Sequence, residues 1–267
     1  ANVMQLVSDG VPIDQTGLPP HFPFEGGSFA NGGAMRIAPL AIAYRNADAE
    51  SLRAAAEAAI ISSHRHVEAV DFAVVQAAAV QHMLRLGAPG ELDAGALLAD
   101  LAGRCRGSAM ASVISGPPPR PSPPASGGEE EREGDDFKAV AAVVARVPRP
   151  GSGMGFQIAS VHMAPCVLWC ACRHAADPRR AVQAAVALGG DTDTTAALVG
   201  ALVGALHGEG EWCAAWAARL ENGERGRDYA LALAEALAGL DPTASVHDGR
   251  RFTAPPTRAT PTRCASA

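Results

Sequence analysis

Aromatic residues are scarce in this sequence, at 4% of its 267 residues, whereas hydrophobic residues make up 48%. Alanine and leucine are abundant among them, which suits closely packed helices better than a β-sandwich rich in aromatic and β-branched side chains. No segment alternates convincingly like a strand, and no unit repeats at a fixed period. The sequence therefore predicts an all-α protein whose core is large enough for one sizeable domain.

An excess of positive charge is also lacking, because the formal net charge at pH 7 is −6. A protein that binds nucleic acid usually presents a basic face, and none is visible here, so we expect no direct nucleic-acid contact. Acidity does not exclude a ligand that resembles a nucleotide. Helix N-termini and metal ions can both hold phosphates in an acidic protein.

No apolar run is long enough to predict a membrane span. The stretch 156–172 is interrupted by Gln157, His162 and Pro165, and the stretch 195–206 is shorter than the roughly 20 apolar residues that a span needs. No signal-peptide pattern is evident. We therefore expect a soluble, intracellular protein that does not bind membranes, and we expect a monomer.

The six cysteines do not follow the spacing of a small disulfide framework, so reduced and mostly buried thiols are predicted. Cys166, Cys170 and Cys172 could together indicate a metal site. However, Cys166 and Cys170 share one helix face while Cys172 points elsewhere, which argues against it.

Residues 1–33 are rich in glycine, proline, aspartate and serine and are predicted to be a loop. Asp48 is the candidate N-cap of the helix predicted at 48–61, and Gly87 is the candidate stop of the helix predicted at 66–86. Apolar periodicity predicts helices at about 34–44, 48–61, 66–86, 91–104, 136–147, 156–173, 178–188, 194–207, 210–220 and 228–239. They form one domain, 1–241, followed by a flexible tail, 242–267.

The segment 116–136 differs sharply from its surroundings because it is rich in proline, glycine and glutamate. Such a composition cannot bury a core and predicts disorder. We interpret it as an insertion between helices, and a partner-binding polyproline II motif is the alternative.

The run Gly189-Gly190-Asp191-Thr192-Asp193-Thr194 is the first candidate site. Paired glycines permit a tight turn, and at a turn that enters a helix two nearby carboxylates can converge. Carboxylate and hydroxyl oxygens suit hard cations such as Mg²⁺, Mn²⁺ or Ca²⁺. A plain helix cap, with Thr192 or Asp193 as the capping residue, is the alternative.

Small residues recur every four positions after this turn, at Ala196, Gly200, Gly204 and Gly208. Glycine inside a helix costs about 1 kcal/mol relative to alanine, so we expect this ridge to allow close approach of a neighbouring helix. The helix would then be central and buried and would hold the turn rigidly.

Four glycines and an asparagine precede the helix predicted near residue 34, in the segment 26–36. Exposed backbone N–H groups at such a loop can form an anion cradle, and a flexible loop that enters a helix is the alternative. Ser63-His64-Arg65-His66 lies between two predicted helices. A histidine there could contact a phosphate or hydroxyl, or simply cap a helix.

Together these segments resemble the ADP-ribosylglycohydrolase family. The Gly-Gly-Asp-Thr-Asp-Thr run with its small-residue spacing, the segment from Ser28 to Arg36 and the Ser63-His64 pair are similar to that family's signatures in order and separation. The resemblance covers about 26–208 without the insertion. It is closest to the branch that cleaves serine-linked ADP-ribose on proteins, poly(ADP-ribose) and O-acetyl-ADP-ribose.

The resemblance implies an orthogonal multi-helix bundle with a binuclear Mg²⁺ centre, in which Mn²⁺ is an alternative metal. Asp191, Asp193 and Thr194 would be metal ligands. The residues that would bind ADP-ribose are Gly27, Ser28, Phe29, Ala30, Asn31, Gly32, His64 and Phe156. Among these, His64 would contact the diphosphate or the ribose, and Phe156 would flank the adenine.

Family members also carry a Thr-Asp-Asp ligand run and an acidic residue before the glycine-rich loop, and this sequence has no equivalent. We therefore expect an N-terminally incomplete domain, a fragment that supplies one side of a two-metal centre. A hydrolase that releases ADP-ribose is the leading hypothesis. The alternatives are a catalytically degenerate paralogue that binds ADP-ribose and a purely structural helical module.

Overall fold

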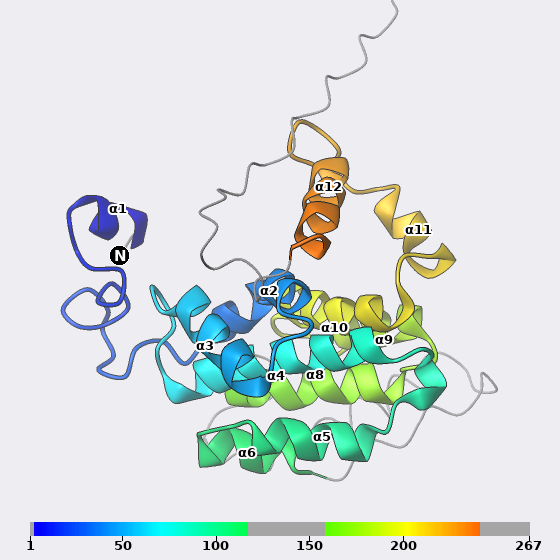
Figure 1. Ribbon diagram of the computed structural model, residues 1–267, viewed down its shortest axis with the longest axis horizontal. Helices are drawn as coiled ribbons and strands as arrows, with labels where there is room; N and C mark the ends of the chain where they lie inside the picture. Colours follow the sequence, from blue (N-terminus) through cyan, green and yellow to red (C-terminus); the bar gives the residue numbers. More distant parts are fainter. Residues whose placement is uncertain (1–2, 117–157, 241–267) are drawn as a thin grey trace, which may run out of the picture.

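The computed structural model describes residues 3–116 and 158–240, and within these ranges the secondary structure is helical (Figure 1). No strand occurs there, apart from an isolated β-bridge between Ala30 and Ala159. The all-α prediction is confirmed. The helices are α1 (Val3–Ser8), η1 (Asn31–Arg36), α2 (Ala38–Ala43), α3 (Ala49–Ile60), α4 (Val67–Arg85), η2 (Pro89–Glu91), α5 (Ala94–Gly103), α6 (Ser108–Ile114), α8 (Ser160–Arg173), α9 (Pro178–Ala187), α10 (Thr192–His207), α11 (Glu211–Ala217) and α12 (Arg227–Ala238).

Helix α4 forms the centre of the bundle. Most of its residues are buried, and Phe72 is fully enclosed. It packs against η1, α2, α3, α8 and α10, which surround it in Figure 1. The many alanines of α4 allow close neighbours, and buried polar side chains such as Asp71, Gln76 and Gln81 find hydrogen-bond partners there.

Helices α8 and α10 complete the core beside α4. Every residue of α8 except Arg173 is buried. Helix α10 buries Leu198, Leu202 and Leu206 along one face, which is the spacing of an amphipathic helix. Gln76 donates a hydrogen bond from Nε2 to the carbonyl of Leu198 at 3.0 Å, which ties α4 to α10.

Helix α10 is central, as predicted, since it packs against α4, α8 and α9, but the packing role predicted for its small residues is wrong. A Cβ added to Gly200 would come no closer than 4.0 Å to Val182 Cγ2, and one added to Gly204 would meet nothing within 4 Å among the described residues. The buried face of α10 is instead lined by larger side chains such as Leu198 and Val199. Within the described part of the chain, close helix approach therefore does not require these glycines.

The remaining predicted helices agree with the structure within a few residues, and Asp48 caps α3 by accepting a hydrogen bond from the Ser51 backbone N–H at 2.8 Å. Several elements differ from the prediction. The segment predicted as one helix at 34–44 forms the 3-10 helix η1, which begins at Asn31, and then α2, and the 3-10 helix η2 was not predicted. Residues 1–33 contain the short helix α1, which buries no residue and so leaves no amphipathic pattern. Helix α6 was not predicted, because its seven residues are too few to show periodicity. The helix predicted at 136–147, most of the insertion and the tail lie outside the described residues.

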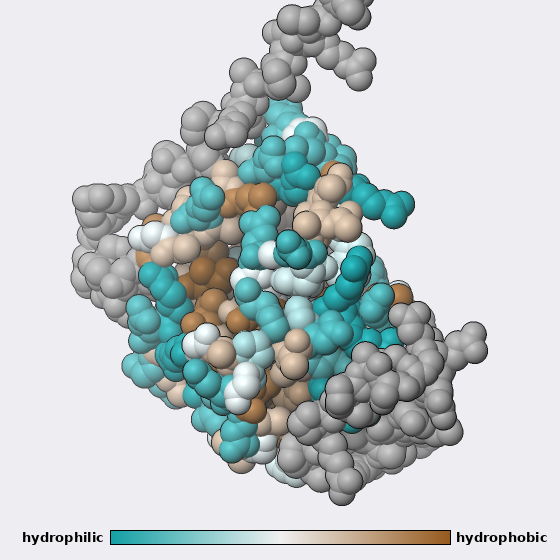
Figure 2. All heavy atoms as spheres, turned by 90° about the vertical axis from the view of Figure 1, so that its right-hand side faces the viewer, coloured by the Kyte–Doolittle hydropathy of each residue, from teal (hydrophilic) through white to brown (hydrophobic). Residues whose placement is uncertain are grey.

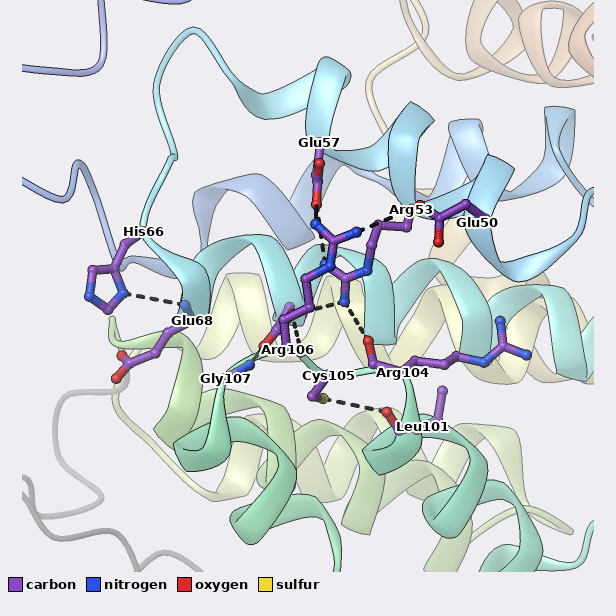
Figure 3. A network of polar contacts seen from close by, with 11 residues as sticks. Glu50, Arg53, Glu57, His66, Glu68, Leu101, Arg104, Cys105, Arg106 and Gly107 are labelled. Carbon is purple, nitrogen blue, oxygen red and sulfur yellow. Dashed lines mark hydrogen bonds and ion pairs between the residues drawn. The ribbon is translucent and has the colours of Figure 1, made fainter.

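A buried ion pair joins α3 to α4, and Figure 3 shows Arg53 with its neighbours Glu57 and Arg104. Arg53 NH2 lies 2.9 Å from Asp71 Oδ1, and Asp71 is 0% exposed. The same carboxylate accepts hydrogen bonds from the backbone N–H groups of Arg106 (3.1 Å) and Gly107 (2.6 Å) in the loop between α5 and α6. Arg53 also donates to the carbonyl of Arg104. These bonds compensate for the removal of both charges from water, and they join α3 and α4 to the loop between α5 and α6.

Helices α11 and α12 lie at the periphery, and neither contains a buried residue. Figure 2, which views the side at the right of Figure 1, shows apolar patches among polar surface. Leu231 of α12 is 44% exposed and Val186 of α9 is 51% exposed. Helices α11 and α12 therefore contribute little to the core around α4.

The five cysteines in the described part of the chain are thiols, and Cys166, Cys170 and Cys172 are buried, as predicted. Burial raises the pKa of Cys166 and of Cys172 to about 12, so both stay protonated thiols. None of the described helices is both long enough and apolar enough to cross a membrane.

Candidate active site

The acidic turn before α10 depends on two glycines. Gly189 and Gly190 have φ values of 73° and 72°, a region that glycine enters without steric cost. Helix α10 begins directly afterwards, with Asp191 at the N-cap position. The prediction that Thr192 or Asp193 would cap the helix is therefore wrong. The Asp191 side chain makes no capping bond, because it points to another partner.

That partner is Asn31, at the start of η1. Asn31 Nδ2 donates a hydrogen bond to Asp191 Oδ2 at 2.6 Å and also lies 3.2 Å from Met163 Sδ in α8. The Asn31 backbone N–H donates to the carbonyl of Ile158 at 2.8 Å. Asn31 is 5% exposed, so its position is fixed from three sides. The glycine-rich loop and the acidic turn, 160 positions apart, thus meet at one point.

The Asp191 carboxyl group is held in its charged form. Burial raises its pKa, but hydrogen bonds with Asn31, Thr194 and Asp193 lower it more, and the net pKa lies below the usual value. Thr194 is buried, whereas Asp193 is exposed. The turn therefore presents a charged carboxylate with a second carboxylate and a hydroxyl beside it.

The loop from Gly27 to Ala30 is anchored to the start of α8. The Ser160 backbone N–H donates to the Phe29 carbonyl at 3.1 Å, and Ser160 Oγ donates to the Ala30 carbonyl at 3.0 Å. The Ala30 N–H in turn donates to Ser28 Oγ at 3.2 Å. Gly27 has a φ of 76°, and a Cβ there would lie 2.9 Å from Arg65 Cβ. The loop is therefore held in one shape by contacts from distant segments.

His64 lies against this loop, as its predicted role requires. A Cβ added to Gly32 would lie 2.8 Å from His64 Nε2, so the ring edge is packed on the Gly32 backbone. Burial, together with the charge of Arg36, lowers the pKa of His64 to about 4. His66 instead caps α4 by accepting a hydrogen bond from the Glu68 N–H at 3.3 Å, which confirms the capping interpretation for that residue (Figure 3).

Of the predicted site residues, the structure brings together Asn31, Asp191 and Thr194, with Gly32 and His64 beside Asn31. Phe156 lies outside the described residues. Sequence reasoning did not identify Ser160 and Met163 of α8 as neighbours of the loop. Apolar periodicity located their helix, but nothing in the sequence indicated which of its residues would face Asn31.

The donor set at the turn fits a hard cation. Asp191, Asp193 and Thr194 offer only oxygen atoms, and Mg²⁺ is commonly bound by one or two carboxylates together with water and substrate phosphates. In the ranges 3–116 and 158–240, no group of three or more His, Cys, Asp or Glu side chains is placed to hold a metal. Among the described residues, the turn therefore offers oxygen ligands of the kind that a hard cation takes, and metal binding stays a prediction.

The acidic turn 189–194 and the glycine-rich loop 26–32 meet in an all-helical bundle and form one candidate site. Comparison with known families defines the class of protein. The model of the ADP-ribosylglycohydrolase family matches residues 3–246. The chain belongs to this family, and its general function is of the ADP-ribosyl hydrolase type. The resemblance stated from the sequence motifs is confirmed.

Proposed function

We propose that this protein hydrolyses the glycosidic bond between ADP-ribose and an acceptor, with Mg²⁺ bound at the turn 189–194. The expected substrates are proteins modified on serine, poly(ADP-ribose) and O-acetyl-ADP-ribose. The observation that carries the proposal is the 2.6 Å hydrogen bond between Asn31 and Asp191. It places the acidic turn directly beside the glycine-rich loop.

The loop and the turn suit two different groups of ADP-ribose, its diphosphate and its terminal ribose. ADP-ribose carries a diphosphate, which backbone N–H groups of a glycine-rich loop can bind. Its terminal ribose carries the bond to be cleaved, with hydroxyl groups that are ligands for hard cations. A ligand whose diphosphate rests on the loop near Gly32 would bring that ribose to Asp191.

Each residue then has a defined role. Asp191, Asp193 and Thr194 would hold Mg²⁺, which when bound would orient the ribose hydroxyls and polarise the bond that breaks. Asn31 orients the Asp191 carboxylate by donating to Oδ2, and it lowers the pKa so that the carboxylate stays charged. Gly32 leaves room for His64 against the loop.

The substitution Asp191→Asn tests the proposal, because it removes one charge and keeps the shape of the side chain. We expect hydrolysis of an ADP-ribosylated serine peptide in Mg²⁺ to fall at least about 100-fold, since loss of a metal ligand impairs both binding and catalysis. The control is Asp177→Asn, which retains a good N-cap for α9, where Asp177 accepts a hydrogen bond from the Arg180 N–H. Full activity of a folded Asp191→Asn protein would contradict the proposal.

A protein that binds ADP-ribose without hydrolysing it is the second candidate function. It is favoured by the lack, within the described residues, of any cluster of three or more His, Cys, Asp or Glu side chains. Titration calorimetry with ADP-ribose and a parallel hydrolysis assay separate the two. Binding without Mg²⁺-dependent turnover supports the second candidate and contradicts the first.

A further inference from the structure

A chain of hydrogen bonds leads from Arg36 to His64. Arg36 NH2 donates to Ser63 Oγ at 2.6 Å, and Ser63 Oγ lies 2.8 Å from His64 Nδ1. The Ile60 carbonyl is a further neighbour of Ser63 Oγ, at 3.5 Å. Because a guanidinium group can only donate, one lone pair of the serine oxygen is occupied by Arg36.

The serine proton has two acceptors within reach, and their distances differ. A hydroxyl hydrogen bond is normally about 2.5–3.0 Å long. His64 Nδ1 at 2.8 Å lies inside this range, and the Ile60 carbonyl at 3.5 Å lies outside it. The shorter distance favours donation from Ser63 to Nδ1, which leaves the ring proton of a neutral His64 on Nε2.

The protonated edge of the ring faces the glycine-rich loop. Nε2 and Cε1 would lie 2.8 Å and 2.9 Å from a Cβ at Gly32, so this edge is packed on the Gly32 backbone. Gly32 follows Asn31, whose amide binds Asp191. Burial and the Arg36 charge lower the pKa of His64 to about 4, in agreement with a neutral ring at physiological pH.

We propose that Ser63 and Arg36 are positioning residues that fix His64 in the Nε2–H tautomer, so that it offers a neutral hydrogen-bond donor to an oxygen of ADP-ribose at the loop. This inference rests on the proposed function for its ligand. The tautomer itself depends only on this chain. A neutral donor suits a site that already has the Arg36 charge nearby, because a charged imidazole would add like-charge repulsion.

The test reads the tautomer directly by nuclear magnetic resonance. In ¹⁵N-labelled protein at pH 7, long-range ¹H–¹⁵N correlations should show His64 with an unprotonated Nδ1 and a protonated Nε2, with the signals assigned by their loss in His64→Gln. Ser63→Ala should shift the ring toward a mixture of tautomers, and Ser63→Thr, which keeps the hydroxyl, should restore the wild-type pattern. A protonated Nδ1 in the wild type, or an unchanged pattern in Ser63→Ala, overturns the proposal.

Calorimetry with ADP-ribose on the same proteins tests the second part of the proposal, in which His64 donates a hydrogen bond to ADP-ribose. Ser63→Ala should bind about 5- to 10-fold more weakly, which is the typical effect of one hydrogen bond, and Ser63→Thr should recover the affinity. The control is Ser62→Ala, which keeps the backbone carbonyl that accepts a hydrogen bond from Thr16. Equal affinity of the wild type and Ser63→Ala overturns the proposal and leaves the proposed function standing. If neither the wild type nor any variant binds ADP-ribose while His64 has the expected tautomer, the proposed function is contradicted and only the positioning role of Ser63 and Arg36 is supported.

Discussion

Two aspartates, Asp71 within α4 and Asp191 just before α10, have contrasting surroundings. Asp71 is fully buried and receives hydrogen bonds from Arg53, Arg106 and Gly107. Asp191 is partly open to solvent and shares its surroundings with Asp193 and Thr194. The first carboxylate is paired with a buried cation and stabilises the fold, whereas the second is left beside another carboxylate. The Asp191 carboxylate also accepts a hydrogen bond from Asn31, which joins the turn to the glycine-rich loop, and under the proposed function it would in addition hold a cation.

The largest expected effect comes from breaking the buried pair. Arg53→Met removes the cation beside the buried Asp71 carboxylate and leaves it only the N–H groups of Arg106 and Gly107, so the free energy of unfolding should fall by about 3–5 kcal/mol in urea titrations. The double variant Arg53→Met/Asp71→Leu should recover part of this loss, because it removes both charges but leaves these two N–H groups without their acceptor. Asp100→Asn, at the surface pair with Arg104, is the control and should cost less than about 1 kcal/mol. A loss at Arg53 no larger than the control would remove the contrast between the two aspartates.

A substitution at the candidate site should change ligand binding clearly and the free energy of unfolding only slightly, unlike the substitutions at the buried pair. Gly32→Ala places a Cβ 2.8 Å from His64 Nε2, and the ring must move to accommodate it. We expect the affinity for ADP-ribose to fall roughly 10-fold through the displaced hydrogen bond, as measured by calorimetry. In Gly103→Ala the added Cβ meets nothing within 4 Å among the described residues, so this variant should bind normally. Unchanged binding by a folded Gly32→Ala protein would show that the His64 position is not critical.

The smallest effect is a pH dependence at His64. The pKa of its ring is about 4 in the folded protein and about 6.5 when unfolded, so the unfolded chain binds the proton more readily between these values. This group therefore stabilises the fold above pH 6.5, and the contribution is lost as the pH falls toward 4. Urea unfolding at pH 7 and pH 5 should show a smaller difference for His64→Gln than for the wild type. Identical differences for the two proteins would contradict the lowered pKa.

Much of the fold could be predicted from the sequence because the long helices are strongly periodic. Asp48 caps α3 as its position before an apolar segment indicates, and the limits of α9 and α10 lie within two residues of the prediction. Short elements such as α6 leave too little pattern to detect. The sequence did not predict the buried pair of Arg53 and Asp71. A charged residue in a helix is expected to be exposed unless its partner on another helix is known.

The family and the chemistry of the candidate site were determined by local sequence. The run from Gly189 to Thr194 encodes its own turn, because two adjacent glycines adopt positive φ and the carboxylates that follow them begin a helix. Only the tertiary structure decided which groups those carboxylates face. Asn31 reaches Asp191 across 160 positions, and His64 is oriented by Ser63 and Arg36. Such contacts depend on how helices pack, and no local pattern of residues specifies that packing.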